Sequence, residues 1–278
     1  MGRIIACIDG AGYTAAVCDY AAWVAMRLNA PLELLHVLVR DADARLDASG
    51  SIGLGAQEAL LEELAALDAR RSALAREHGR QILEGGRRRV MSMGMHDVAT
   101  RQRSGELVEA LAEIEPETRL FVLGRHDDGG RPRRFLLDHD LESAVRALQR
   151  PMLVAAAPFT PPRRFLIAFD GSATGRGMVE KVAESPLLQG LDGVVAMVGG
   201  EASALRWAEE RLAAADFRIT AVALQGEPSD ALLDQAARQG ADLLVMGAYG
   251  HSRIRHLVVG STTTSILRQS GIPVFILR

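Results

Sequence analysis

The sequence predicts an α/β fold made of two tandem doubly wound domains, each with an open five-stranded parallel sheet. The first reason is length, because 278 residues are about twice the usual size of a compact α/β domain. The second is an internal repeat, and the third is the alternation of short apolar runs with helical patterns inside each copy. Together these observations indicate two similar units joined in one chain.

The repeat is clearest at the two ends of each copy. Residues 3–10, RIIACIDG, match residues 164–171, RFLIAFDG, and both read as an apolar strand that ends in Asp-Gly. Residues 142–154 align without a gap to residues 264–276, each a helix followed by Pro and a last apolar strand. The segment between the copies, PFTPP, has the composition of a stiff linker. The predicted domains are therefore residues 1–157 and residues 163–278.

The second copy shows the order of elements most plainly. Five apolar runs predict buried strands at residues 165–169, 194–198, 219–224, 243–246 and 273–277. Helical patterns lie between them, at about residues 174–185, 203–214, 229–239 and 261–270. This alternation predicts a parallel sheet with helices on both faces.

The first copy has the same order with one difference, a longer segment at residues 41–80 after its second strand. A Gly/Ser-rich patch at residues 49–55 precedes an amphipathic helix. The leucines of that helix are spaced to form one apolar face, namely Leu60, Leu61, Leu64 and Leu67. We expect this face to pack on the core of its own domain; a helix that binds a partner is the alternative.

Composition and charge exclude several classes of protein. The net charge of −3 gives no electrostatic footprint for nucleic acid or for an anionic membrane. No apolar run approaches the roughly 20 residues of a membrane span, and the first residues lack the order of a signal peptide. We therefore expect a cytoplasmic protein that binds neither nucleic acid nor membrane. Cys7 and Cys18 are expected to be packing atoms rather than a disulfide.

The segment that carries chemistry is MGAYGHSRIRHLVVGSTT, residues 246–263. It contains Gly-x2-Gly-x9-Gly-Ser directly after a strand and at the start of a helix. Glycine lacks Cβ, so its backbone can approach a ligand closely. The backbone N–H groups of Ser261, Thr262 and Thr263, at the start of the last predicted helix, favour a bound phosphate. Taken alone, the glycines fit turn and cap positions equally well.

This pattern resembles the ATP-binding signature of the universal stress protein family, and the resemblance covers almost the whole chain twice. It implies a fold like that of the adenine nucleotide alpha hydrolases, with ATP as cofactor, alone or with Mg²⁺. It also implies that Asp170 lies near the adenosine and Val198 at the adenine. The loop residues around the phosphates are then Met246, Gly247, Gly250, Gly260, Ser261 and Thr262. His251 and Arg253 lie in the same loop and can reach polyphosphate, although solvation is an equal alternative for each.

The first copy keeps the strand ends and loses the phosphate loop. Asp9 corresponds to Asp170, but Asp138 stands where the second copy has Gly260, and His139 where it has Ser261. A carboxylate suits a helix N-terminus and repels a triphosphate, so we expect Asp138 to cap the helix. ATP is therefore expected in the second copy only.

These observations favour a regulatory protein of stress or metabolic adaptation that binds ATP without fast turnover. No catalytic residue and no metal site are predicted, because GxxxxGK[ST], HExxH and clustered cysteines are absent. The alternatives are a slow ATPase or autokinase that uses Ser261 or Thr262, and an interaction scaffold with a vestigial site. The resemblance also implies an intramolecular pseudo-dimer through the last strands, residues 152–155 and 274–277. A homodimer and an unidentified protein partner stay open.

Overall fold

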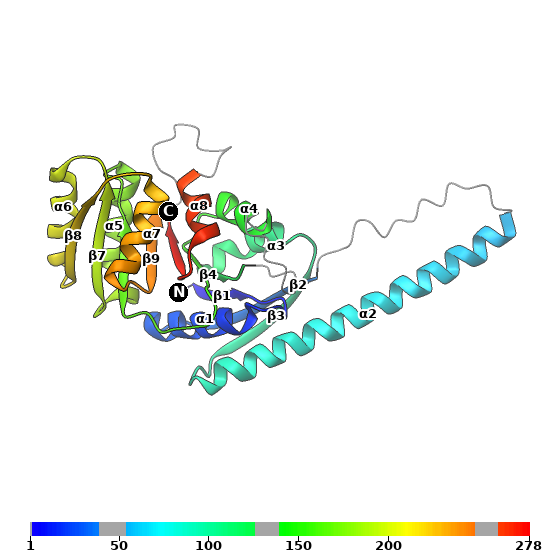
Figure 1. Ribbon diagram of the computed structural model, residues 1–278. Coiled ribbons are helices and arrows are strands. Elements are labelled where there is room, and N and C mark those ends of the chain that lie inside the picture. Colours follow the sequence, from blue (N-terminus) through cyan, green and yellow to red (C-terminus); the bar gives the residue numbers. More distant parts are fainter. Residues whose placement is uncertain (1, 39–53, 126–138, 248–260) are drawn as a thin grey trace.

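The computed structural model describes residues 2–38, 54–125, 139–247 and 261–278. These residues form one 10-stranded sheet in the order β3-β2-β1-β4-β5-β10-β9-β6-β7-β8 (Figure 1). The strands of the first half are β1 (Arg3–Cys7), β2 (Leu32–Leu38), β3 (Val98–Ser104), β4 (Thr118–Leu123) and β5 (Met152–Val154). Those of the second half are β6 (Arg164–Ala168), β7 (Asp192–Val198), β8 (Arg218–Leu224), β9 (Leu243–Gly247) and β10 (Val274–Leu277). The α/β class predicted from the sequence is confirmed.

Both halves use the same strand order. Counted within each half, the strands lie in the order third, second, first, fourth, fifth, and all pairs inside a half are parallel. Each half is therefore a doubly wound unit of the kind that the internal repeat predicts. The domain limits at residues 157 and 163 stay a prediction.

The two halves meet at their last strands. β5 and β10 pair antiparallel, with Val274 opposite Val154, Phe275 opposite Leu153 and Ile276 opposite Met152. The predicted intramolecular pseudo-dimer is confirmed. This pairing turns two exposed strand edges into the middle of one sheet, which removes two edges that could otherwise pair with other chains.

Helices cover both faces of the sheet, and each face has its own apolar core. One core packs beneath α1 (Thr14–Leu28), α2 (Leu54–Ser92), α5 (Ala173–Glu184) and α6 (Ala202–Ala213). The other packs beneath α3 (Leu107–Ile114), α4 (His139–Ala147), α7 (Pro228–Gln239) and α8 (Ser261–Gln269). The connections therefore change face once within each half, between its second and third helices, and the first and fourth strands flank the resulting topological switch point.

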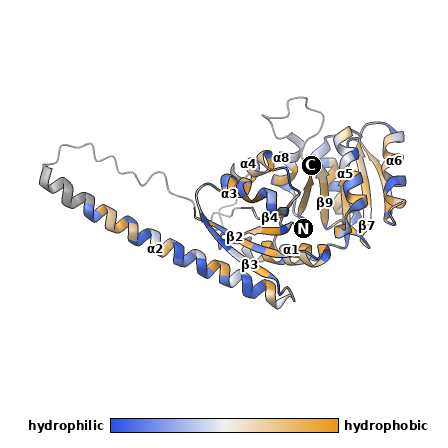
Figure 2. Cartoon of the chain, turned by 180° about the vertical axis from the view of Figure 1, so that it is seen from behind, coloured by the Kyte–Doolittle hydropathy of each residue, from blue (hydrophilic) through white to orange (hydrophobic). Residues whose placement is uncertain are grey.

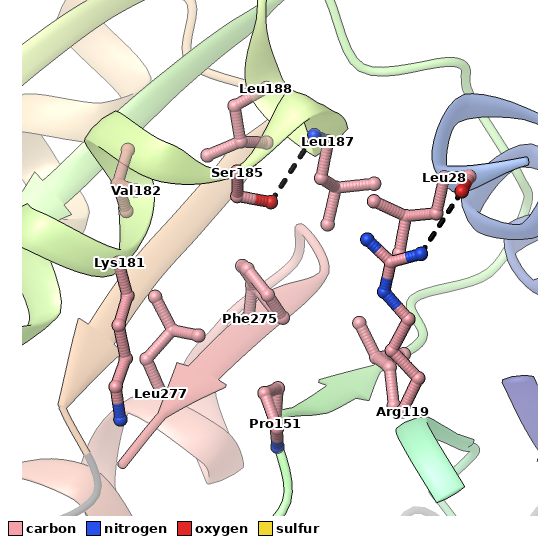
Figure 3. Close-up of a pocket in the computed structure, with 11 residues that line it drawn as sticks. Leu28, Arg119, Pro151, Lys181, Val182, Ser185, Leu187, Leu188, Phe275 and Leu277 are labelled. Atoms are coloured by element: carbon pink, nitrogen blue, oxygen red, sulfur yellow. Dashed lines mark hydrogen bonds between the residues drawn. The ribbon is translucent and has the colours of Figure 1, made fainter. Parts of the chain in front are cut away.

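Side chains also join the halves beside the sheet. Arg27, in the last turn of α1, donates hydrogen bonds to the carbonyl oxygens of Leu187 and Gln189 in the second half. A pocket of about 160 Å³ lies at this junction, between the end of α1, the end of α5 and β10 (Figure 3). Apolar side chains line most of it, and Phe275 points into it from β10. On this face of the sheet, the two halves are packed against each other except for this small void.

α2 is a 39-residue helix, and only its C-terminal part packs on the sheet. There Gly79, Leu83, Gly86 and Val90 form a buried face, and a Cβ at Gly86 would lie 2.8 Å from Ile8 Cδ1. Further out the helix leaves the sheet (Figure 1), and Leu67 is 57% exposed. The expectation that the leucine face packs on its own domain is wrong for Leu67. A straight helix of this length is about 58 Å long and extends beyond the sheet it crosses.

No helix within residues 2–38, 54–125, 139–247 and 261–278 has the length and apolarity needed to span a bilayer.

The two cysteines give a first prediction. Both are free thiols; burial raises the pKa of Cys18 to about 12, and burial together with the charge of Asp9 raises the pKa of Cys7 to about 12. Because the thiolate is the nucleophile, both thiols should alkylate far more slowly than free cysteine in the folded protein at about pH 8. The rate should keep rising with pH and level off only near pH 12, whereas the rate for free cysteine levels off near its pKa of about 8.5. Iodoacetamide labelling followed by mass spectrometry measures this.

The control is the same reaction in guanidinium chloride, where both thiols should label fully. Cys7 is half-buried whereas Cys18 is fully buried, so Cys7 should react first. Labelling of Cys18 in the native protein at the rate of free cysteine would contradict the prediction.

Candidate nucleotide site

The carboxyl ends of β6, β7 and β9 bring several predicted residues together. Ala168 of β6 lies opposite Ala196 of β7 and Met246 of β9. Val198 ends β7 and Asp170 follows the end of β6 by two residues, so both lie at the carboxyl edge of neighbouring strands. Gly247 follows Met246 at this edge. Since adjacent strands are about 4.8 Å apart, these four predicted residues form one continuous strip.

This strip lies at a topological switch point. β6 has β7 on one side and β9 on the other. The helix after β6, α5, packs on one face of the sheet, and α8, which follows β9, packs on the opposite face. In open α/β sheets, ligands bind where connections diverge in this way. The carboxyl edge between β6 and β9 is therefore the candidate site of the second half.

Asp170 is held in place by the turn that follows it. Its Oδ1 accepts hydrogen bonds from the backbone N–H of Ser172 at 3.0 Å and from the Ser172 hydroxyl at 2.7 Å. Ser172 in turn caps α5, because its Oγ accepts from the N–H of Gly175 at 3.0 Å. The carboxylate is exposed, and Oδ2 accepts no hydrogen bond from the described residues. An oriented carboxylate with one unused oxygen suits hydroxyl donors such as those of a ribose.

Val198 ends β7 as a half-buried apolar side chain. The chain then turns sharply, with φ of +65° at Gly199 and +79° at Gly200. Residues with side chains rarely adopt these φ values, so the two glycines allow this turn directly after β7 and add no side chain at the carboxyl edge of the sheet. Val198 and the buried Met246 thus provide apolar surface on either side of Asp170.

The predicted phosphate loop is only partly described. β9 ends at Gly247 and α8 begins at Ser261, and these two positions bracket residues 248–260. Gly250, His251, Arg253 and Gly260 lie outside the described residues. In the first turn of α8, Ser261 is exposed, Thr262 is half-buried and Thr263 is buried. The described residues therefore supply the two ends of the loop.

The corresponding edge of the first half is filled by side chains. A Cβ at Gly10 would lie 2.7 Å from Ile82 Cδ1, whereas at the matching Gly171 the nearest described atom is Ala204 Cβ, at 3.5 Å. A second contact shows the same difference. Among the described residues, a Cβ at Gly247 would have no atom within 4 Å. A Cβ at Gly124, the matching glycine of the first half, would lie 2.9 Å from the Tyr13 and Val17 side chains. The two halves share a backbone plan, and as far as the described residues go they differ in the space beside these glycines.

Asp138, which the sequence predicts to cap α4, lies outside the described residues. Arg125, beside that segment, has its guanidinium carbon 5.5 Å from the centre of the Tyr13 ring. This contact adds to the filling of the first half.

Four residues of these edges were not singled out from the sequence. Ser172 and Gly175 hold Asp170, and a Cβ at Gly175 would lie 2.4 Å from Asp170 Oδ1. The Asp-Gly-Ser order after a strand is a readable signal, because Ser is a common helix cap. Ala204 and Ile82 carry no such signal, since each comes from a helix that is distant in sequence.

Within the described ranges, no group of three or more His, Cys, Asp or Glu side chains is placed to hold a metal ion.

Comparisons with known proteins give a consistent picture. A model of the universal stress protein family matches residues 1–155 and 192–278. The universal stress protein Slr1230 of Synechocystis is 32% identical over 287 residues, covering 100% of both chains. A crystal structure of a universal stress protein from Archaeoglobus fulgidus has a TM-score of 0.72 at 17% identity, covering 99% of this chain and 96% of that one. A putative universal stress protein from Pseudomonas aeruginosa has a TM-score of 0.62 at 17% identity, covering 99% and 92%.

The second stretch matched by the family model begins at residue 192 and so excludes Asp170. The position of Asp170 at the candidate site therefore rests on the strand register and on its hydrogen bonds.

Proposed function

Because the chain belongs to the universal stress protein family as a tandem two-domain member, we propose that it is an ATP-binding regulatory protein with one nucleotide site, in its second half. One observation carries the proposal. The edge beside Asp170 is open among the described residues, while Ile82 and Tyr13 fill the equivalent edge of the first half.

Each residue of the proposed site has a chemical role. Asp170 Oδ2 accepts hydrogen bonds from the ribose hydroxyls, and Val198 and Met246 contact the adenine ring. The backbone at Gly247, Gly250 and Gly260 approaches the phosphates, which the N–H groups at the start of α8 bind together with the helix dipole. The remaining contributors are the hydroxyl groups of Ser261 and Thr262 and the cationic side chains of His251 and Arg253, whereas Thr263, which is 3% exposed, contributes its backbone N–H. Mg²⁺ would enter as the counter-ion of the phosphates.

The same set of groups argues against fast chemistry. Backbone N–H donors bind a triphosphate and its transition state for hydrolysis almost equally. They therefore give affinity for the nucleotide but accelerate its hydrolysis little. Asp170 is the only carboxylate assigned to the site, and its Oδ1 already accepts two hydrogen bonds from Ser172. A phosphoryl-transfer enzyme needs further groups to hold metal and to orient the nucleophile. The proposed function is therefore binding, with turnover far below about 1 per second.

Analysis of the purified protein distinguishes this proposal from its two alternatives. Nucleotide released by denaturation and identified by chromatography should be ATP. ADP in its place would favour a slow ATPase or autokinase, and an empty protein that also fails to bind ATP in calorimetry would favour a scaffold. Steady-state turnover with Mg²⁺ in the range of about 1–1000 per second, lost on Ser261→Ala, would overturn the binding proposal.

Gly260→Asp should remove ATP binding, because the carboxylate that the first half carries at this position would repel the phosphates. We expect the affinity to fall at least about 100-fold, with little change in the free energy of unfolding. Titration calorimetry measures the affinity, and guanidinium unfolding measures the stability. Asp138→Gly is the matched change in the first half, and it should not create a second site. Unchanged affinity in Gly260→Asp would contradict the assignment of the loop.

A further inference from the structure

The outer part of α2, residues 54–78, is a surface that the nucleotide site does not use. It extends away from the sheet (Figure 1), and apolar and polar residues alternate along residues 62–78 (Figure 2). Leu67 and Leu74 are 57% and 65% exposed, and Leu64 is half-buried. These are among the few large apolar side chains left exposed in the described part of the chain. An apolar surface on an extended helix requires an explanation.

The leucines repeat as they do in a coiled coil. Leu60, Leu67 and Leu74 are seven residues apart, and Leu64 lies on the same stripe. The stripe does not continue the face that packs on the sheet. Leu67 and Gly86 are 19 positions apart, which places them about 100° apart around the helix axis. The stripe is therefore a separate apolar surface.

Along this stretch, α2 packs very little against the rest of its own chain. From residue 62 to residue 78 every side chain is exposed except Leu64 and Glu77, which are half-buried. Helices in proteins gain most of their stability from packing of an apolar face. The stripe is thus suited to packing against another helix.

The charges along this segment are separated by sign. Residues 54–69 contain only acidic charges, namely Glu58, Glu62, Glu63 and Asp68. Residues 70–80 contain Arg70, Arg71, Arg76 and Arg80 against a single acid, Glu77, which is paired with Arg80. Two copies placed antiparallel bring the acidic stretch of each against the basic stretch of the other. Parallel copies would place like charges together.

We propose that the outer part of α2 pairs with the same segment of a second copy of this chain, as a short antiparallel two-helix coiled coil centred near Leu67. In this arrangement Leu60 of one copy lies against Leu74 of the other. Glu63 then lies near the basic stretch that begins at Arg70. The surface is complementary to itself, as a two-fold dimer requires. The acidic outer end disfavours an anionic membrane as the alternative occupant.

The oligomeric state of the full chain tests the proposal. Sedimentation velocity should show a dimer that dissociates on dilution from tens of micromolar. Leu67→Lys should raise the dissociation constant at least about 100-fold, since each copy loses a buried leucine. Ala69→Lys is the matched control, because Ala69 is exposed and lies about 200° around the helix from Leu67. Circular dichroism should show that both variants keep their fold.

Two outcomes of this experiment overturn the proposal. One is a wild-type chain that remains monomeric at about 100 µM, a concentration at which even a weak specific pair forms. The other is a dimer that Leu67→Lys and Ala69→Lys weaken equally. ATP binding should be the same in Leu67→Lys as in the wild type, so the result is independent of the proposed nucleotide site.

Cross-linking tests the orientation. In an antiparallel pair, a mixture of Leu60→Cys and Leu74→Cys chains should form a disulfide-linked dimer under mild oxidation. Neither variant alone should do so, because its two cysteines would be about 21 Å apart. Cys7 and Cys18 should remain poor partners, because the raised pKa of each thiol leaves little of the reactive thiolate. Cross-linking of Leu60→Cys alone would show a parallel pair, and no cross-linking in the mixture would show no pair; either result overturns the proposal.

Discussion

The double substitution Thr174→Tyr and Ala204→Ile should lower ATP affinity at least about 100-fold, which is about 2.7 kcal/mol of binding free energy. These changes copy into the second half the side chains that fill the first. Tyr13 corresponds to Thr174 in the aligned repeat, and Ile82 occupies the position beside Gly10 that Ala204 occupies beside Gly171. The added side chains would occupy the space next to Asp170, where the ribose and phosphates are proposed to bind.

Calorimetry with ATP measures the effect. Controls distinguish a loss of affinity caused by the added side chains in the site from one caused by a disrupted fold. Ala213→Ile adds the same side chain at an exposed position of α6, so it should bind ATP like the wild type. Thr174 is exposed, so Tyr is tolerated there without strain in the core. Ala204 is only 7% exposed, so guanidinium unfolding must also show that the double variant keeps the stability of the wild type. Wild-type affinity in the double variant would show that ATP does not bind at this edge.

The reciprocal change, Tyr13→Thr with Ile82→Ala, removes the filling of the first half. It should not produce ATP binding there, because that half lacks the glycine loop. A second equivalent of bound ATP in this variant would show that filling alone, rather than the loop, distinguishes the halves.

Phe275→Ala should cost about 3–5 kcal/mol of the free energy of unfolding. Phe275 is 4% exposed, lies opposite Leu153 where β10 pairs with β5, and lines the pocket of about 160 Å³ at the junction. Removal of the ring enlarges a void that already exists, and the antiparallel pairing limits how far the two strands can move to close it. The surrounding structure therefore has little scope to relax.

Guanidinium unfolding followed by circular dichroism gives the measurement. Phe275→Leu keeps most of the apolar volume and should cost less than about 1.5 kcal/mol. A loss below about 1 kcal/mol in Phe275→Ala would show that the junction contributes little to the stability of the chain.

The elements that the sequence predicted correctly are those with strong local patterns. The run at residues 194–198 lies within β7, and the Asp-Gly pair after residue 168 marks the end of β6, because a buried parallel strand is a continuous apolar run between turn residues. The pairing of β5 with β10 was predicted from the resemblance to the universal stress protein family, and it removes an exposed edge from each half.

What could not be predicted depends on contacts between distant segments. The spacing of leucines in α2 identifies an apolar face but not what covers it, and for Leu67 the expected cover is absent from its own domain. Ile82 and Tyr13 likewise look ordinary in sequence. Their effect on the first half appears only when α2 and the start of α1 are placed over the ends of β1 and β4.

The antiparallel pairing of β5 with β10 has a consequence for how the protein can change over time. In an assembly of two identical single-domain chains, one mutation alters both copies of a site, so ligand binding is kept or lost in both together. Here the two halves have separate sequences within one chain. They stay covalently joined whichever residues are substituted at the carboxyl edge of either half. Side chains such as Ile82 and Tyr13 can therefore accumulate in one half without affecting the other. A chain with two similar halves can in this way come to bind one ligand instead of two.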